Sequence, residues 1–536
     1  MRRAVLYCNG KFITFSRHKP VAESVASYGG RIILAGTREE CVEAFPPGVR
    51  FDEVDLHGNV AVPGFRDSHL HLLSFGLSLA NLSLHGANSI EYVKARVAEA
   101  SHAVAPEDWI IGRGWDQDLF AERRYPSRLD LDEAAPGKAV YLVRSCGHVG
   151  VASSKALEIA GITRDTPDPP DGMIDRDGSG NPTGILRERA QSLLLRCVPR
   201  PGPDTFKGAL RAGIRKAVEA GLTSVSTNDG QAGFQGTMDL YKDVMQSLGI
   251  APRVYWDVPW DFYPELLETP LRTNCGDEFF RIGAIKLFAD GSLGARTAAL
   301  ESNYDDDPGN AGILAASEQE LSEQVYKAHA SGMQVAVHAI GDRALRLALK
   351  AISDAQVRIP SPWRRHRIVH AQVVSPELVR EMRRTGVIAD IQPRFVNTDM
   401  KWAEARLGKA RARYAYAWRT LLRAGIPLAG GSDCPVEPIA PLLGIYAAVT
   451  RKNEEGEPEG GWYPEEKISV EEAVKLFTSG PAFAEFQEDV AGAIEPGKFC
   501  DLTVLNCDPM SVPGDDIRNI EVVMTVVGGD VAYARD

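Results

Sequence analysis

Short apolar segments alternate with amphipathic segments over the second half of the chain. The apolar segments are rich in β-branched residues, are four to eight residues long and predict strands. Helical spacing or helix-boundary residues separate them, so strand and helix alternate. The predicted strands span residues 222–227, 253–258, 281–288, 335–338, 367–370, 387–392 and 426–431.

Boundary residues support the helices of this alternation. Ser317–Glu320 forms a capping box, and Gly332 follows the last residue with helical spacing. Ser375 and Pro376 provide an N-cap and a first helical residue, and Gly386 provides a stop. The sequence therefore predicts helices between these strands.

Alternating strands and helices imply a parallel sheet in an α/β fold. The apolar segment Ala61–Phe65 adds an eighth strand, the number in a closed (β/α)₈ TIM-like barrel. More than a hundred residues follow before the second strand, including helical runs at Ser89–Val104 and Ser153–Ala160. This length is too great for one loop. We therefore expect a barrel over residues 61–490, with an inserted cap at 75–205 after the first strand.

Both ends of the chain consist of short strand patterns and tight turns. Asn9-Gly10 is a hairpin signal after the strand pattern Val5–Cys8, and Gly29-Gly30 and Gly528-Gly529 resemble it. Two small β-rich pieces thus flank the rest of the sequence. Together, residues 1–60 and 491–536 are expected to form one small β-sandwich subdomain.

Two histidines follow the first predicted barrel strand. Because side chains alternate faces in extended backbone, His69 and His71 point the same way and form half of a divalent-metal site. Alone, the pair is as compatible with chance proximity, one histidine capping a helix, as with a metal site. Other parts of the chain are needed to decide.

Four more polar residues lie at or near the ends of later strands. Lys286 interrupts an apolar strand, His338 and His370 end the next two, and Asp433 follows the last. Strand carboxyl ends form the catalytic face of such barrels. Each residue has a structural alternative: a core histidine, a paired lysine, a helix-capping aspartate. Their joint occurrence with the histidine pair favours a metal site.

Composition narrows the remaining function classes. The 536 residues carry a net charge of −12 without a basic face, which argues against a nucleic-acid partner. No apolar run is long enough to cross a bilayer, so no membrane partner is expected. The eight cysteines are scattered without a C-x-x-C pair, as in reducing compartments. The first residues lack the apolar run of a secretory signal, and a cytoplasmic location is expected.

These residues resemble the ligand pattern of the amidohydrolase superfamily. Three further motifs resemble its YtcJ-like branch, amidohydrolase family 3, which includes N-substituted formamide deformylase. They are Lys286–Gly294, Val337–Ala344 and Gly431–Val436. With Gly497–Leu502 in the C-terminal β-subdomain, the resemblance covers nearly the whole chain.

The resemblance implies one or two divalent ions, most simply two zinc ions bridged by a carbamate formed on Lys286. Two metals about 3.5–4 Å apart would share a hydroxide as nucleophile. A single metal stays open, as do iron, manganese and nickel. The implied ligands are His69 and His71 for one metal, His338 and His370 for the other, the modified Lys286 and Asp433.

The implied activity is metal-dependent hydrolysis of a non-peptide carbon–nitrogen bond, of the amide or N-substituted formamide type, with Asp433 as general acid and base. One alternative is a mononuclear deaminase acting on a ring amidine. That chemistry needs a glutamate near His338, and Ala339–Asp342 supplies none. A catalytically inactive scaffold is a third alternative, against which the complete ligand set argues.

Residues of the predicted cap resemble segments that line the pocket in this branch. Trp115 would offer an apolar wall, and His148 a donor to a carbonyl or developing oxyanion. Packing within the insert is the alternative for both. Arg187-Glu188 and Gln392-Pro393 are further candidates. The expected partner is a small-molecule substrate, and a homodimer is compatible with the sequence.

Overall fold

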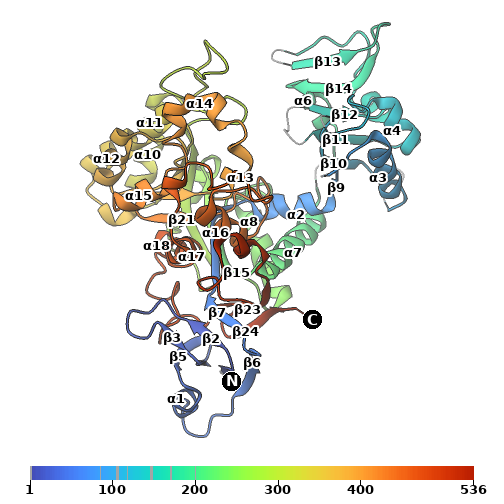
Figure 1. The fold of residues 1–536 in the computed structure, drawn as a ribbon. Coiled ribbons are helices and arrows are strands. Elements are labelled where there is room, and N and C mark those ends of the chain that lie inside the picture. Colours follow the sequence, from blue (N-terminus) through green and yellow to red (C-terminus); the bar gives the residue numbers. More distant parts are fainter. Residues whose placement is uncertain are drawn as a thin grey trace. The chain divides into compact units, whose positions relative to one another are not determined.

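The chain divides into two compact units. Unit 1 combines Met1–Phe75 with Leu210–Asp536, and unit 2 is Gly76–Ala209. Helices α2 (Leu72–Ala80) and α7 (Pro203–Glu219) carry the chain across the two boundaries (Figure 1). The computed structural model describes residues 3–84, 86–103, 105, 108–117, 119–144, 149–169, 172–199 and 201–535.

Eight parallel strands of unit 1 form the predicted TIM-like barrel. Backbone hydrogen bonds bring its two edge strands together, from Asp433 N to His69 O and from His71 N to Cys434 O, both 2.8 Å. In spatial order the strands are β8 (Phe65–Leu70), β15 (Leu222–Thr227), β16 (Arg253–Pro259), β17 (Phe280–Phe288), β18 (Val335–Ala339), β19 (Arg367–His370), β20 (Ile388–Ile391) and β21 (Leu428–Gly430).

Helices separate and surround these strands. The predicted capping box of Ser317 and Glu320 opens α10, and Gly386 ends α12 with a φ of 71°. No helix in the described ranges is both long and apolar enough to cross a bilayer. The unit 1 helices are α1 (Arg38–Glu43), α8 (Phe234–Leu248), α9 (Tyr263–Leu267), α10 (Glu318–Ala330), α11 (Asp342–Arg358), α12 (Pro376–Thr385), α13 (Phe395–Asp399), α14 (Ala403–Ala412), α15 (Trp418–Arg423), α16 (Pro441–Thr450), α17 (Val470–Leu476) and α18 (Ser479–Ala484).

Segments from both chain ends build two further sheets of unit 1, and their strands lie side by side (Figure 1). Buried side chains of the two sheets, including Tyr7, Phe12, Leu502 and Val526, share one hydrophobic cluster. One sheet has the order β5 (Arg31–Gly36), β4 (Ser24–Tyr28), β1 (Ala4–Cys8), β6 (Asp52–Asp55). The other has the order β24 (Asp530–Ala534), β23 (Val522–Val527), β22 (Leu502–Leu505), β7 (Val60–Pro63), β2 (Lys11–Ile13), β3 (Val21–Ala22).

The predicted first barrel strand, Ala61–Phe65, is wrong in its bounds. β7 pairs with β2 and β22 in the terminal sheet, and the barrel strand β8 begins only at Phe65. Gly64 stands between them, and a Cβ there would lie 2.3 Å from Thr223 Oγ1. The chain changes sheets at a residue that has no room for a side chain. His69 consequently lies within a strand.

Two of the three predicted tight turns join paired strands. Gly29-Gly30 links β4 to β5 and Gly528-Gly529 links β23 to β24, and all four glycines have positive φ. This is the conformation that two-residue hairpins need. The hairpin predicted at Asn9-Gly10 is wrong: β1 pairs with β4 and β6, whereas β2 pairs with β3 and β7. That turn carries the chain from one sheet to the other.

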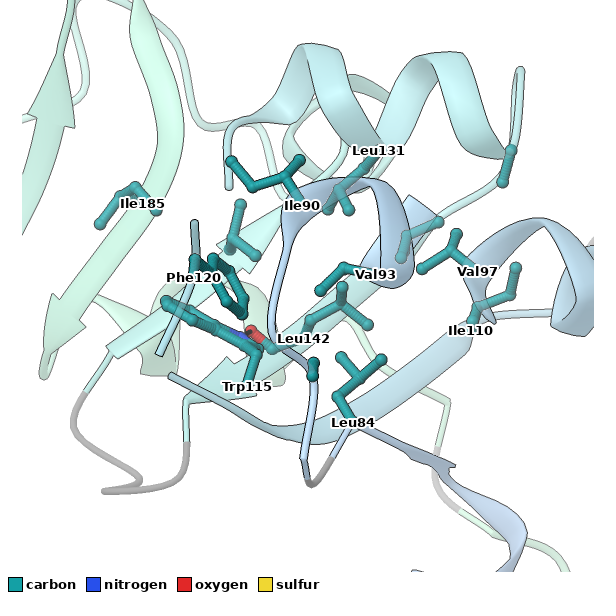
Figure 2. Packing of buried hydrophobic residues seen from close by; sticks show 14 of the residues in the cluster. Leu84, Ile90, Val93, Val97, Ile110, Trp115, Phe120, Leu131, Leu142 and Ile185 are labelled. Carbon is teal, nitrogen blue, oxygen red and sulfur yellow. Dashed lines mark hydrogen bonds between the residues drawn. The ribbon is translucent and has the colours of Figure 1, made fainter. Parts of the chain in front are cut away.

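Unit 2 has its own sheet and hydrophobic core. Figure 2 shows helix residues Ile90, Val93 and Leu131 packed with strand residues Ile110 and Leu142. The coverage of the barrel mouth by this insert stays a prediction. Its sheet has the order β13 (Gly172–Arg176), β14 (Pro182–Glu188), β12 (Val149–Ala152), β11 (Val140–Arg144), β10 (Ile110–Trp115), β9 (Leu82–Ser83), and its helices are α3 (Ile90–Ala103), α4 (Arg128–Ala134), α5 (Ser154–Ile159) and α6 (Gln191–Leu195).

A buried ion pair joins the barrel to the terminal sheets. Arg253 of β16 meets Asp501 in two hydrogen bonds of 2.8 and 3.0 Å, and both side chains are less than a tenth exposed. The guanidinium lies 3.5 Å from the ring centroid of Phe499. Gly528 N also donates to Asp501, at 2.7 Å. The motif that contains Phe499 and Asp501 therefore has a structural role: it links the terminal sheets to the barrel.

Replacing Asp501 should destabilise the protein strongly, because the change leaves the Arg253 charge buried without its partner. For Asp501→Ala we expect a loss of about 3–5 kcal/mol in the free energy of unfolding, measured by urea denaturation. Glu471→Ala is the control, since it breaks an exposed pair with Lys475 and should cost at most about 1 kcal/mol. Equal effects of the two substitutions would contradict this account.

Candidate metal centre

The predicted ligands converge at the carboxyl ends of the barrel strands. Their imidazole rings form a continuous chain, with centroid separations of 5.4 Å between His69 and His71, 5.8 Å between His69 and His370, and 4.5 Å between His370 and His338. Five barrel strands and their following residues supply the set. Its members are His69 from β8, His71 directly after β8, Lys286 from β17, His338 from β18, His370 from β19 and Asp433 after β21.

Asp433 lies between the two histidines of the first pair. Its Oδ1 is 3.5 Å from His69 Nε2 and 3.2 Å from His71 Nε2. One potential ligand atom from each of these three residues lies within 4.8 Å of the other two. His69 and Asp433 are buried, and His71 is partly exposed. This spacing allows all three atoms to reach a single ion.

Lys286 lies in contact with the same group. Its Nζ is 3.2 Å from His69 Nε2, and the side chain is buried. Burial lowers the pKa of Lys286 to about 8, although carboxylates such as Asp433 oppose the shift. The amine therefore loses its proton far more readily than an exposed lysine does, and only the neutral form has a lone pair for a covalent or coordinate bond.

The other two histidines are oriented by fixed acceptors. His338 Nε2 lies 3.0 Å from the carbonyl oxygen of Gly291, and His370 Nδ1 lies 2.6 Å from Oε1 of Gln392. Because these oxygens only accept hydrogen bonds, each contacting nitrogen carries the proton. Nδ1 of His338 and Nε2 of His370 are left with free lone pairs. Such outer hydrogen bonds orient metal-binding histidines.

The electrostatic environment keeps three imidazoles neutral. Burial lowers the pKa of His69 and of His338 well below the usual value, and that of His370 to about 4. For Asp433, burial opposes ionisation, but the hydrogen bond from His71 and nearby positive charge outweigh it and lower the pKa. Neutral imidazoles and an ionised carboxylate are the forms that bind metals.

The backbone is strained at two of these positions. His370 has a φ of 77° and Asp433 a φ of 56°, a region that side-chain-bearing residues enter at a cost of about 1–3 kcal/mol. Asp67 supports the second position, since its carboxylate accepts the backbone N–H groups of Ser432 and His69 at 3.0 and 3.1 Å. One buried carboxylate thus joins the two edges of the barrel below the site.

A buried ionic layer, defined here as Arg367, Asp390 and Asp257, lies inside the barrel on the amino-terminal side of the candidate ligands. Arg367 donates to Asp390 at 2.6 Å and to Ser68 O at 2.7 Å, and lies 3.0 Å from Asp257. Asp257 in turn accepts the backbone N–H of Ala284 at 2.9 Å. Ser68, Arg367 and Ala284 precede His69, His370 and Lys286 on their strands by one to three residues. The layer therefore fixes the strand positions from which the ligands project.

Local sequence patterns did not predict this layer or the role of Asp290. A charge in an apolar strand segment indicates a site residue at Lys286, and Arg367 and Asp390 show the same pattern. The Asp290 carboxylate is buried and accepts backbone N–H groups of Ala299, Ile340 and Gly341. It thereby holds together the loops that follow β17 and β18.

Of the residues predicted to line the pocket from the cap, the structure describes Trp115 and Arg187-Glu188. Trp115 is fully buried in the core of unit 2, near Phe120 and Tyr125, and its indole donates to the carbonyl of Leu142 at 3.0 Å (Figure 2). This burial favours packing, the alternative left open for Trp115, and a substrate role stays a prediction. His148 lies outside the described residues. Arg187 forms two hydrogen bonds with Asp175.

Comparison with known proteins identifies the family. The sequence profile of the amidohydrolase family matches residues 52–533. This chain belongs to that family. YtcJ of Bacillus subtilis, which is named as an amidohydrolase, is 36% identical over 491 residues, covering 90% of this chain and 91% of YtcJ. The N-substituted formamide deformylase of Arthrobacter pascens is 26% identical over 550 residues, covering 99% of each.

A solved structure agrees with this assignment. The uncharacterized metal-dependent hydrolase of Pyrococcus horikoshii OT3 is 28% identical, covers 95% of this chain and 99% of its own, and superposes with a TM-score of 0.80. The predicted resemblance to the YtcJ-like branch is thus confirmed. This amidohydrolase is a metal-dependent hydrolase of carbon–nitrogen bonds.

The donor set fits the divalent metal that this class uses. Imidazole nitrogens and a carboxylate are suited to zinc and to similar ions. Three of the imidazoles are held neutral, and His338 and His370 each keep one ring nitrogen free. The residues present are therefore able to hold at least one divalent ion.

Removing the acceptor that orients His370 should weaken metal binding. For Gln392→Ala we expect an affinity loss of about 10- to 100-fold, the usual effect of losing such a partner, measured by titrating the metal-free protein. Gln372→Ala is the control, because this buried amide contacts Tyr416 and Asp399. An unchanged affinity in Gln392→Ala would show that the hydrogen bond does not orient the ring.

Proposed function

We propose that this amidohydrolase cleaves an amide or N-substituted formamide bond of a small molecule. The observation that carries the proposal is the Asp433 carboxylate within 3.5 Å of both His69 and His71. Lys286 contacts His69, and the rings of His370 and His338 continue the cluster. The full-length similarity to an N-substituted formamide deformylase supports the bond type.

The proposed centre holds two zinc ions. Bound metal would act as a Lewis acid and lower the pKa of a coordinated water from 15.7 to about 7. The ligands would be His69 and His71 on one side, His338 and His370 on the other, and Lys286 between them as a carbamate. The lowered pKa of Lys286, about 8, makes the neutral amine that reacts with carbon dioxide more accessible than in an exposed lysine.

Asp433 is the proposed general acid and base. Its low pKa keeps it ionised at the start of the cycle, so it is able to accept a proton from the attacking water. Once protonated, the same carboxyl would donate to the leaving nitrogen, which must be protonated to depart as an amine. The strained backbone of Asp433, fixed through Ser432 by Asp67, would hold the carboxyl in place for both transfers.

The deaminase alternative is less well supported. The only acidic side chain in Ala339–Asp342 is that of Asp342, and its carboxylate accepts backbone N–H groups of Glu301 and Arg343 at the start of α11. It is engaged in positioning the helix rather than held free for proton transfer. The inactive-scaffold alternative has no supporting observation, since all six positions carry a residue that is able to bind metal, Lys286 once it is carboxylated.

Metal analysis followed by a substrate screen tests the proposal. Protein purified without chelators should contain close to two divalent ions per chain. It should release formate or another carboxylic acid from N-formyl or N-acyl amines, and chelation should abolish this activity until metal is restored. Release of ammonia from ring amidines, with one ion per chain, would favour the deaminase instead.

Removing the carboxylate of Asp433 should abolish most of the turnover. For Asp433→Asn we expect kcat to fall by about 10²- to 10⁴-fold, the usual contribution of general acid–base catalysis, with metal content measured in parallel to separate proton transfer from metal loss. Asp342→Asn is the control and should stay close to the wild-type rate. A large loss in the control would instead implicate the segment that the deaminase alternative requires.

A further inference from the structure

Phe288 ends β17 on the side of the strand that carries Lys286. Side chains two residues apart in a strand share a face, so Ala284, Lys286 and Phe288 all point toward the barrel axis, with Phe288 nearest the mouth. Its ring centroid lies 5.3 Å from that of His338, and Lys286 Nζ lies 5.0 Å from the Phe288 ring. The phenyl ring therefore borders the candidate metal centre.

Phe288 is 48% exposed, although the groups around it are buried. Lys286 is 1% exposed and His370 is 5% exposed. Exposing so much of a phenyl ring to water forgoes hydrophobic stabilisation. No described side chain of unit 1 buries the exposed half of the ring. Within unit 1, the exposed face is thus open to an apolar group that enters the site.

A second aromatic ring lies on the other side of the histidine chain. Phe395 stacks on His370, with a centroid separation of 5.8 Å and an interplanar angle of 17°, and it is almost buried at 9% exposure. Phe395 packs against the candidate metal ligand His370, whereas the exposed face of Phe288 is directed toward the mouth of the barrel. Of the two rings, only Phe288 is placed to contact a bound molecule over a large area.

We propose that Phe288 determines specificity by packing against an apolar substituent of the substrate, so that amides with an aromatic group are preferred over those with a methyl group. The inference rests on the proposed amide-hydrolase function and deepens it. A phenyl ring has no proton to transfer, which excludes a role as acid or base. Aromatic pairs favour stacked or edge-to-face contact beyond simple burial, and this favours an aromatic substituent.

Binding of two hydroxamates to the metal-loaded full-length protein tests the inference without turnover. Both probes share the metal-chelating group and differ in phenyl against methyl. Wild type should bind benzohydroxamate more tightly than acetohydroxamate. Phe288→Ala should weaken benzohydroxamate by about 10- to 100-fold and acetohydroxamate by no more than about 3-fold, and Phe288→Leu should lie between, all measured by calorimetric titration.

Phe279→Ala is the matched control. Phe279 is 41% exposed and lies just before the opposite end of the same strand, so its loss removes a comparable phenyl ring far from the ligands. It should change neither affinity. Metal content and circular dichroism of each variant identify a variant that has lost its fold.

Two results would overturn the inference. If Phe288→Ala weakens both hydroxamates equally, the ring serves only to pack Lys286 and His338. If wild type shows no preference for the aromatic probe, Phe288 does not contact the ligand. A parallel turnover assay with N-formyl benzylamine and N-formyl methylamine separates the two levels: loss of aromatic preference in an active enzyme counts against Phe288 alone, whereas aromatic hydroxamate preference without amide turnover counts against the proposed function alone.

Discussion

The positions of His69, Lys286 and His370 depend on one guanidinium buried in the barrel. Arg367 is excluded from water, so its N–H groups require partners from the protein. Asp390, Asp257 and the backbone carbonyl of Ser68 provide them. Since these partners lie on different strands, the pairing of charges fixes those strands relative to one another.

That rigidity explains how the site holds unfavourable geometry. His370 and Asp433 have left-handed backbone conformations, and a loosely held loop would relax from them. Around them, Asp67 and Asp290 together accept five backbone N–H groups from the segments that carry or flank the ligands. The buried carboxylates of Asp67 and Asp290 thus hold the candidate ligands in place without being candidate ligands themselves.

The barrel and the cluster of candidate ligands were predictable because both follow local patterns. Strand periodicity gave most strand bounds within two residues, and histidines at strand ends converge in any closed parallel barrel. The division at Gly64 was not predictable, since the apolar pattern continues across it and only the contact with Thr223 requires glycine. Nor does sequence separate a buried Trp115 from one that lines a pocket, because both settings select the same residue. The partners of Arg367 come from strands distant in sequence, so no local pattern reveals them.

The single residue between β7 and β8 has a further consequence. β7 is held by β22, which comes from the far end of the chain, and the strand that continues from β7 contains His69. A terminal sheet and a candidate metal ligand are thus separated by a single-residue connection, Gly64, which is too short to absorb displacement. Accordingly, the terminal sheet cannot be separated from the barrel without disturbing β8, and a strand late in the sequence helps to fix the position of the candidate ligand His69.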